Sequence, residues 1–288
     1  MRKRKLGGNG VEVTAIGLGA MPLSIDGRPD ERTAIEVIRA FVEGGGDFID
    51  TANVYCMNTR DIGHNERLIS KALKSIGRVD DVRIATKGGL TKEGSGWDSD
   101  ARPVWLRSSC EQSLMDLQCD RIFLYQLHAP DPRVPLADSV GELARLQKEG
   151  KILHIGLSNV NVTEIDSALK IAPIISVQNK CHVLLKKAFR SGVVELCRKK
   201  NIAFIPHSPV GGHRQQGRLG ESKQIAAIAA KHRASPQQIG LAWLLAKGDH
   251  IIPIPGASRA ASILSSLKAL DIGLDADDVG VLDKLADS

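Results

Sequence analysis

Three consecutive segments decide the fold of this 288-residue chain: Ile122-Phe-Leu-Tyr-Gln-Leu127, Leu136-Ala-Asp-Ser-Val-Gly-Glu-Leu-Ala-Arg-Leu-Gln-Lys-Glu149 and Ile152-Leu-His-Ile-Gly-Leu157. In the middle segment, apolar side chains recur at helical spacing, and the pattern ends at Gly150, a residue typical of helix ends. The two flanking segments are nearly continuous apolar runs, as expected for parallel strands that are covered on both faces. The stretch therefore predicts a strand, a helix and a second, parallel strand.

The same alternation extends in both directions along the chain. Further strands are predicted at residues 15–18, 48–50, 82–86, 174–177, 203–205 and 251–254. Further helices are predicted at residues 32–43, from a cap at Asn65 to about Ser75, and at 105–117, 222–232, 237–246 and 276–286, the last with Asp275 as its cap. Before the first strand, residues 4–6 and 11–13 flank an Asn9-Gly10 turn, which predicts a β-hairpin.

Eight such units without a long linker or a break in composition predict one domain over residues 1–288, of the α/β class and with a (β/α)8 TIM barrel architecture. A doubly wound sheet is the rival fold, and it normally carries a glycine-rich phosphate turn after its first strand. Here Gly17-Leu-Gly19 supplies two glycines, but the third is missing. The barrel is therefore favoured.

The composition limits the classes of function. Hydrophobic residues make up 42% and charged residues 25% of the chain, and no apolar run approaches the length of a membrane span. The net charge is +6, but aromatic residues are only 3%, which argues against stacking on a nucleic acid. The five cysteines show no paired metal-ligand spacing, so we expect no metal site, reduced thiols and a cytoplasmic location.

Reactive side chains follow three consecutive predicted strands. Asp50, Lys87 and His128 stand at the ends of these strands, and Tyr55 lies in the loop after Asp50. Barrel enzymes carry their catalytic groups at the carboxyl ends of the strands, so these four side chains are expected to lie close together.

This set is typical of a general acid that faces a carbonyl group. A free tyrosine has a pKa of about 10, and a nearby ammonium group such as that of Lys87 is expected to lower it. Asp50 would keep Lys87 charged and in place, and His128 would share the proton or bind the substrate oxygen. Each residue also has a purely structural interpretation. Asp50 and Lys87 could form an ion pair without a catalytic role, His128 could only make hydrogen bonds within its loop, and Tyr55 could only pack against its neighbours.

The motifs around these residues resemble those of the aldo-keto reductase family. They are Asp50-Thr-Ala with Tyr55, Ala85-Thr-Lys87 and Leu124-Tyr-Gln-Leu-His128, and the similarity continues through residues 150–159, 177–179 and 252–256. The resemblance implies a barrel whose floor is closed by the N-terminal hairpin. It also implies reduction of aldehydes or ketones with a nicotinamide cofactor, with Tyr55 as the acid–base residue, Lys87 and Asp50 tuning it, and His128 orienting the carbonyl.

The resemblance further implies a cofactor site that needs no dinucleotide-binding sheet. Its residues are Gly19, Ala20, Met21, Asp50, Ser158, Asn159, Gln178, His207, Ser208, Val210, Gly212, Gly256, Ser258 and Arg259. Ser158, Asn159 and Gln178 would bind the carboxamide, and residues 207–212 would cross the pyrophosphate.

Two positions depart from the family pattern. His207 stands where a larger aromatic residue usually stacks on the nicotinamide, and Ser262 stands where a second basic or amide residue is common. Arg259 remains as a partner for a 2′-phosphate. We therefore expect NADPH to be preferred, with NADH as the alternative.

Two other functions remain open on the sequence. Lys87 could form a Schiff base, as in aldolases, although Asp50 is expected to raise its pKa and so oppose that chemistry. The chain could also be a cofactor-binding redox sensor with little turnover. The expected partner is a small carbonyl compound bound by a monomer or weak oligomer, and substrate choice is assigned to residues 23–30, 57–63, 90–103 and 130–135.

Overall fold

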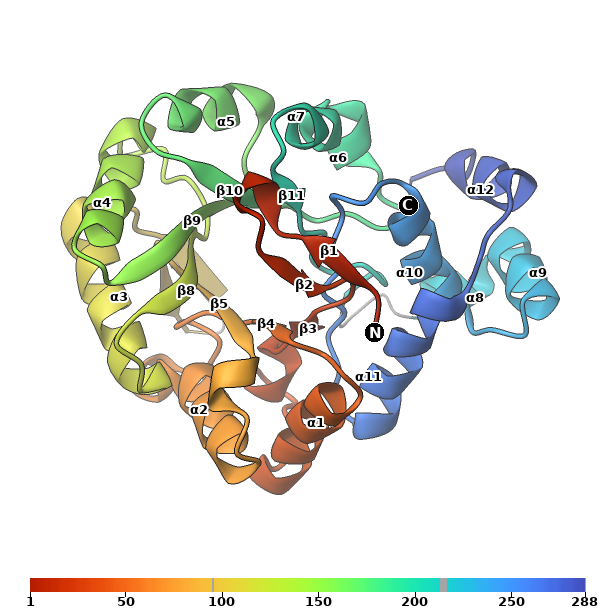
Figure 1. Cartoon of the computed structure of the whole chain (residues 1–288), viewed down its shortest axis with the longest axis horizontal. Helices are drawn as coiled ribbons and strands as arrows, with labels where there is room; N and C mark the ends of the chain where they lie inside the picture. The colour runs from red at the N-terminus through yellow and green to blue at the C-terminus, as the bar shows by residue number, and fades with distance from the viewer. Residues whose placement is uncertain (95, 213–216, 288) are drawn as a thin grey trace.

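Parallel strands form the centre of the molecule. The computed structural model describes residues 1–94, 96–212 and 217–287. Its main sheet runs in the order β3 (Leu18–Gly19), β4 (Phe48–Asp50), β5 (Arg83–Gly88), β8 (Ile122–Leu127), β9 (Ile152–Ser158), β10 (Ile174–Gln178) and β11 (Ala203–Phe204). The sheet curls around the barrel axis, and the α-helices surround it (Figure 1).

The eighth predicted strand is present only as isolated bridges. Parallel bridges join Phe204 to Ile251, His207 to Ile254, and Gly19 to Gly256, and these close the gap between β11 and β3. The prediction of a continuous strand at residues 251–254 is wrong because Pro253 has no backbone N–H to donate to the ladder. The first strand, predicted at residues 15–18, forms only at Leu18–Gly19, where it pairs with β4.

Helices cover the outside of the barrel. They are α1 (Glu31–Glu43), α2 (His64–Ser75), α3 (Pro103–Leu117), α4 (Leu136–Lys148), α5 (Val162–Leu169), α6 (Lys187–Arg190), α7 (Val193–Lys199), α8 (Arg218–Glu221), α9 (Lys223–Lys231), α10 (Pro236–Ala246), α11 (Ala260–Leu267) and α12 (Ala276–Asp283). Asp275 caps α12, as predicted, but that helix ends three residues earlier than expected. No helix in the described ranges is long and apolar enough to cross a membrane.

The predicted cap of α2 is wrong. Gly63, in the left-handed conformation, precedes the helix, and Asn65 lies inside its first turn. The Asn65 side chain is fully buried and bonds elsewhere, since its Nδ2 donates to Ala20 O at 2.8 Å and its Oδ1 accepts from Thr51 Oγ1 at 2.5 Å. Asn65 therefore does not cap α2; its hydrogen bonds link this helix to the barrel instead.

The N-terminal hairpin closes one end of the barrel. Strands β1 (Lys3–Lys5) and β2 (Glu12–Thr14) pair antiparallel, one residue further from the turn than predicted, and cross the barrel opening in Figure 1. Leu6 and Val13 pack with apolar side chains inside the barrel, among them Phe48, Leu124 and Ile252. The (β/α)8 barrel with a hairpin at its floor is thus confirmed.

One further hairpin was not predicted. Strands β6 (Leu90–Glu93) and β7 (Gly96–Ser99) form it within the loop expected at residues 90–103. Ser95 lies outside the described residues, as do residues 213–216 and Ser288 of the predicted domain at 1–288.

Candidate active site

An ion pair lies inside the barrel at the carboxyl ends of β4 and β5. Because β4 pairs with β5 in register, the ends of the two strands bring Asp50 and Lys87 together. Lys87 Nζ donates to Asp50 Oδ1 at 2.5 Å and to Thr51 O at 2.9 Å. Both side chains are buried, and the Lys87 side chain is fully so. A carboxylate oxygen and a backbone carbonyl oxygen therefore hold the ammonium group in place.

Two amides complete the surroundings of the Asp50 carboxylate. Gln178 Nε2 donates to Asp50 Oδ2 at 2.7 Å, and Gln126 Nε2 donates to the same atom at 3.1 Å. Gln126 comes from β8, is fully buried, and was not predicted to be part of the site. The signal was available, because Gln126 is a polar residue inside an otherwise apolar strand.

Tyr55 lies over this ion pair. Its hydroxyl accepts a hydrogen bond from Lys87 Nζ at 3.2 Å, and only 7% of the residue is exposed. Burial raises the pKa of Tyr55, and this outweighs the lowering effect of Lys87. Lys87 thus acts on this pKa in the expected direction, but the net shift is upwards, because burial was not visible in the sequence. At neutral pH the hydroxyl carries its proton.

Lys87 stays charged in spite of its burial. Burial acts to lower its pKa, but the charge of Asp50 and the hydrogen bonds from Lys87 to Asp50 and Tyr55 act in the opposite direction and prevail. The pKa of Lys87 is raised overall, as the sequence led us to expect from Asp50.

His128 and His207 are neutral imidazoles beside the ion pair. Burial, followed by the charge of Lys87, lowers the pKa of His128 well below its ordinary value. The same causes lower the pKa of His207 to about 3. The His128 ring meets the Tyr55 ring edge-on, with centroids 5.8 Å apart, and its Nδ1 is buried without a hydrogen-bond partner.

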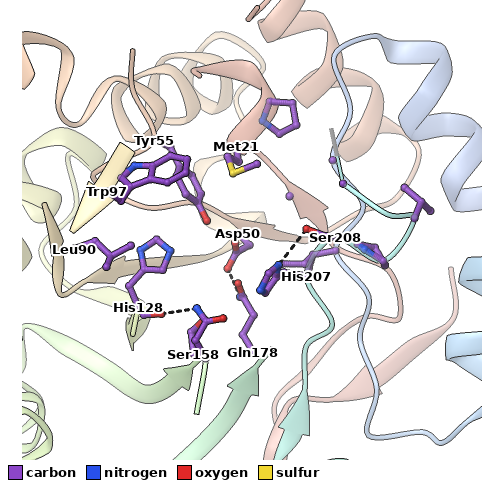
Figure 2. A pocket seen from close by; sticks show the side chains of 18 residues that line it. Met21, Asp50, Tyr55, Leu90, Trp97, His128, Ser158, Gln178, His207 and Ser208 are labelled. Carbon is purple, nitrogen blue, oxygen red and sulfur yellow. Dashed lines mark hydrogen bonds between the residues drawn. The ribbon is translucent and has the colours of Figure 1, made fainter. Parts of the chain in front are cut away.

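A cavity of about 300 Å³ opens above these groups. It brings together most of the predicted residues: Gly19, Met21, Asp50, Tyr55, His128, Ser158, Asn159, Gln178, His207, Ser208, Val210, Gly212 and Gly256. Figure 2 shows Asp50 and Tyr55, from the end of β4 and the loop that follows it, and His128, from the end of β8, converging on the cavity, with His207 and Ser208 on the opposite side.

Four predicted residues do not border this cavity. Lys87 lies beneath it, and Ala20 is fully buried behind Met21, where its backbone N–H donates to Asp50 O at 2.9 Å. Ser258 and Arg259 are exposed at the start of α11. They are placed to act only on a ligand that extends out of the cavity.

Five lining residues were not among the predicted site residues: Pro22, Leu90, Trp97, Pro209 and Ile254. Leu90 and Trp97 come from the hairpin β6–β7, inside the segment 90–103 to which substrate choice was assigned, but the position of this hairpin over the barrel could not be derived from the sequence. Pro22 and Pro209 adjoin predicted residues, and Ile254 lies two positions before Gly256, so proximity along the chain was the signal.

The polar groups on one wall suit a primary carboxamide. Gln178 has its N–H group engaged by Asp50, which leaves its Oε1 as an acceptor. Asn159 has a left-handed backbone with φ of 59°, and its Nδ2 donates to His128 O at 2.9 Å, which leaves its Oδ1 as a second acceptor. Ser158 contributes a hydroxyl that can donate or accept. This wall therefore offers the acceptors and the donor that a carboxamide needs.

Comparisons with known proteins agree on one family. A model of the aldo/keto reductase family matches residues 15–287. The probable aldo-keto reductase 1 of Glycine max is 34% identical, over 96% of this chain and 86% of the plant protein. An uncharacterized oxidoreductase of Schizosaccharomyces pombe is 34% identical, over 94% of this chain and 86% of its own. The crystal structure of the thermostable aldo-keto reductase Tm1743 with the inhibitor epalrestat is similar with a TM-score of 0.85 at 30% identity, covering 99% of this chain and 100% of that chain.

Proposed function

Since this chain belongs to the aldo/keto reductase family, a family of carbonyl oxidoreductases, we propose that it reduces an aldehyde or ketone to the alcohol with a nicotinamide cofactor, and that Tyr55 supplies the proton. The proposal is supported by the close arrangement of four side chains, those of Asp50, Tyr55, Lys87 and His128. Tyr55, Lys87 and Asp50 form one hydrogen-bonded chain, and His128 borders the same cavity.

The residues have separate tasks in this proposal. Tyr55 gives its hydroxyl proton to the carbonyl oxygen as the carbonyl carbon accepts a hydride, so that one C–H and one O–H bond form. The ammonium group of Lys87 then stabilises the phenolate that Tyr55 becomes. Asp50 holds that ammonium group in place. His128, being neutral, would donate a hydrogen bond to the carbonyl oxygen without competing as an acid.

The cofactor supplies the hydride when it is bound. Ser158, Asn159 and Gln178 would bind its carboxamide, because their free acceptors and hydroxyl match that group. The ring of His207 would border the nicotinamide. Ser208, Val210 and Gly212, with Gly19, Met21 and Gly256, would line its path out of the cavity.

NADPH is proposed as the preferred form. Arg259 precedes α11 in an extended conformation, is exposed, and stands beside Ser258 where backbone N–H groups begin a helix. A guanidinium group there would bind a 2′-phosphate through two hydrogen bonds. Arg259→Ala should weaken NADPH binding by about 1.5–3 kcal/mol and leave NADH binding nearly unchanged, as measured by quenching of intrinsic fluorescence. Equal losses for the two cofactors would remove Arg259 from the phosphate site.

The two rival functions have direct tests. A Schiff-base aldolase needs a neutral lysine, whereas the pKa of Lys87 is raised. Borohydride trapping on Lys87 with a carbonyl substrate would support the aldolase. A redox sensor would bind cofactor with little turnover.

The proposed setting is a single domain at residues 1–288 that acts in the cytoplasm as a monomer or weak oligomer. All five cysteines, Cys56, Cys110, Cys119, Cys181 and Cys197, are free thiols, which supports a reducing environment.

The deciding experiment is turnover of 4-nitrobenzaldehyde, followed by the loss of the reduced cofactor. We expect steady turnover with NADPH and slower turnover with NADH at low cofactor concentration. Tight cofactor binding without turnover of this aldehyde or of a panel of sugars would favour the sensor.

A further inference from the structure

The hairpin β6–β7 forms one wall of the cavity beside the proposed proton donor. Leu90 and Trp97 border the cavity from this hairpin, and neither has a task in the proton chemistry. Figure 2 shows both side chains on the same side as Tyr55 and His128, opposite His207. A role other than proton transfer, namely contact with the ligand, is therefore considered for these two side chains.

The indole of Trp97 is held in place by its neighbours. Its Nε1 donates to Val54 O at 3.1 Å, which ties it to the residue before Tyr55. Lys92 Nζ lies 4.6 Å from the centre of the indole ring. Although 42% of Trp97 is exposed, its one polar atom is already bonded, so its apolar surface is what it offers to the cavity.

Leu90 is anchored from the other side of the hairpin. It packs against the small apolar cluster of Ala52, Val54 and Tyr55. The carbonyl of Leu90 accepts a hydrogen bond from Trp105 Nε1 at 3.3 Å, and this second tryptophan does not border the cavity. The wall is thus fixed by contacts outside the cavity, which reduces the conformational entropy lost when a ligand packs on it.

From this arrangement we propose that Trp97 selects the substrate, favouring carbonyl compounds that carry a flat, apolar substituent such as an aromatic ring. The inference rests on the proposed reductase function. With the carbonyl oxygen directed at Tyr55 and His128, the organic substituent of the substrate lies towards the hairpin. A rigid indole then packs on a flat ring over a larger area than on a short or puckered chain.

The test compares substrates within each variant, so that changes in the chemical step cancel. The kcat/KM values for benzaldehyde, cyclohexanecarbaldehyde and propanal are measured for wild type, Trp97→Ala, Trp97→Phe and Trp105→Phe. Benzaldehyde and cyclohexanecarbaldehyde have the same number of carbon atoms, but only the first is flat. Trp105→Phe is the matched control, because it removes a hairpin contact without changing the lining of the cavity. Thermal melting shows that each variant is folded.

Trp97→Ala should lower kcat/KM for benzaldehyde by about 10–100-fold relative to propanal, since pocket contacts of this size discriminate to that extent. Trp97→Phe should keep most of the preference for benzaldehyde over cyclohexanecarbaldehyde, and Trp105→Phe should leave the ratios within about threefold. Unchanged ratios in a folded Trp97→Ala protein, or an equal shift in Trp105→Phe, would overturn the assignment. If wild type reduces none of the aldehydes, the proposed function fails instead.

Discussion

Strand β5 separates two buried carboxyl groups that have opposite surroundings. Lys87 points into the barrel and meets Asp50, whereas the adjacent Thr86 points outwards and meets Glu66 of α2. Asp50 accepts hydrogen bonds from an ammonium group and two amides. Glu66 accepts one from the Thr86 hydroxyl at 2.5 Å, and its Oε2 is buried without a partner.

The difference shows how little a single hydroxyl compensates a buried carboxyl group for the water it has lost. Burial raises the pKa of Glu66 to about 7, although the hydrogen bond from Thr86 acts to lower it. A hydroxyl does not replace the solvation that a carboxylate loses, whereas a cation with further donors does. The ion pair of Asp50 and Lys87 lies on the face of β5 where chemistry is proposed.

Removing the cation from the inner face should have the largest effect. Lys87→Met takes away the charge that stabilises the Tyr55 phenolate, so the rate of carbonyl reduction should fall by about 10²–10⁴-fold. The pKa of Tyr55 should rise further, because Lys87 lowers it in the native protein. The alkaline limb of the pH–rate profile should accordingly move to higher pH. A profile and rate like those of wild type would mean that the ion pair is only structural.

Neutralising the carboxyl group on the outer face should instead stabilise the protein. Glu66 has a pKa of about 7 in the folded state against an ordinary value of 4.5, so between these pH values the folded state holds a proton that the unfolded state has lost. The contribution of protonated Glu66 to the free energy of unfolding is fully present below pH 4.5 and is lost as pH rises to about 7. The side chain of the Glu66→Gln variant cannot ionise. The free energy of unfolding of this variant above pH 7 should therefore exceed that of wild type by roughly 3 kcal/mol, because each pKa unit corresponds to about 1.4 kcal/mol.

Denaturant unfolding at several pH values measures this difference. The two proteins should have equal stability near pH 4.5, and the gap should widen towards pH 7. A gap that does not depend on pH would show that Glu66 is ionised in the folded protein.

Removing one amide from Asp50 should have a smaller effect than removing its cation. Gln126→Leu deletes one of the two amide bonds to Oδ2, and a hydrogen bond to a charged group is worth about 1.5–3 kcal/mol. If Gln126 positions Asp50 and through it Lys87, kcat should fall about tenfold and the pH–rate profile should shift, with little change in cofactor binding. Ser176→Ala is the control, because Ser176 is buried inside the same barrel and its Oγ has no hydrogen-bond partner. Equal losses in both variants would indicate general disturbance of the barrel.

The smallest effect is expected on the outer side of β5. Thr86→Val removes the hydroxyl that binds Glu66 and should cost about 1 kcal/mol of stability. It should leave the pH–rate profile unchanged within about twofold, since Thr86 does not contact the ion pair. A shift like that of Lys87→Met would mean that the two faces of β5 are coupled.

Much of the barrel could be predicted because its strands and helices differ in local pattern. Asp50, Lys87 and His128 could be placed together because parallel strands end at one edge. Gln126 was missed because the register that directs it towards Asp50 depends on pairing across β8 and β5. The lowering effect of Lys87 on the pKa of Tyr55 was predicted, but the net rise was not, because it depends on burial, to which the hairpin β6–β7 contributes.

The central claim is that Tyr55 donates the proton, and single-turnover kinetics of Tyr55→Phe test it most directly. With NADPH bound in excess and 4-nitrobenzaldehyde as substrate, the rate of cofactor oxidation is compared with that of wild type, and the NADPH dissociation constant is measured in parallel. We predict a rate about 10²–10⁴-fold lower with an unchanged dissociation constant, because only the proton is lost. A Tyr55→Phe protein that keeps half of the wild-type single-turnover rate would contradict it.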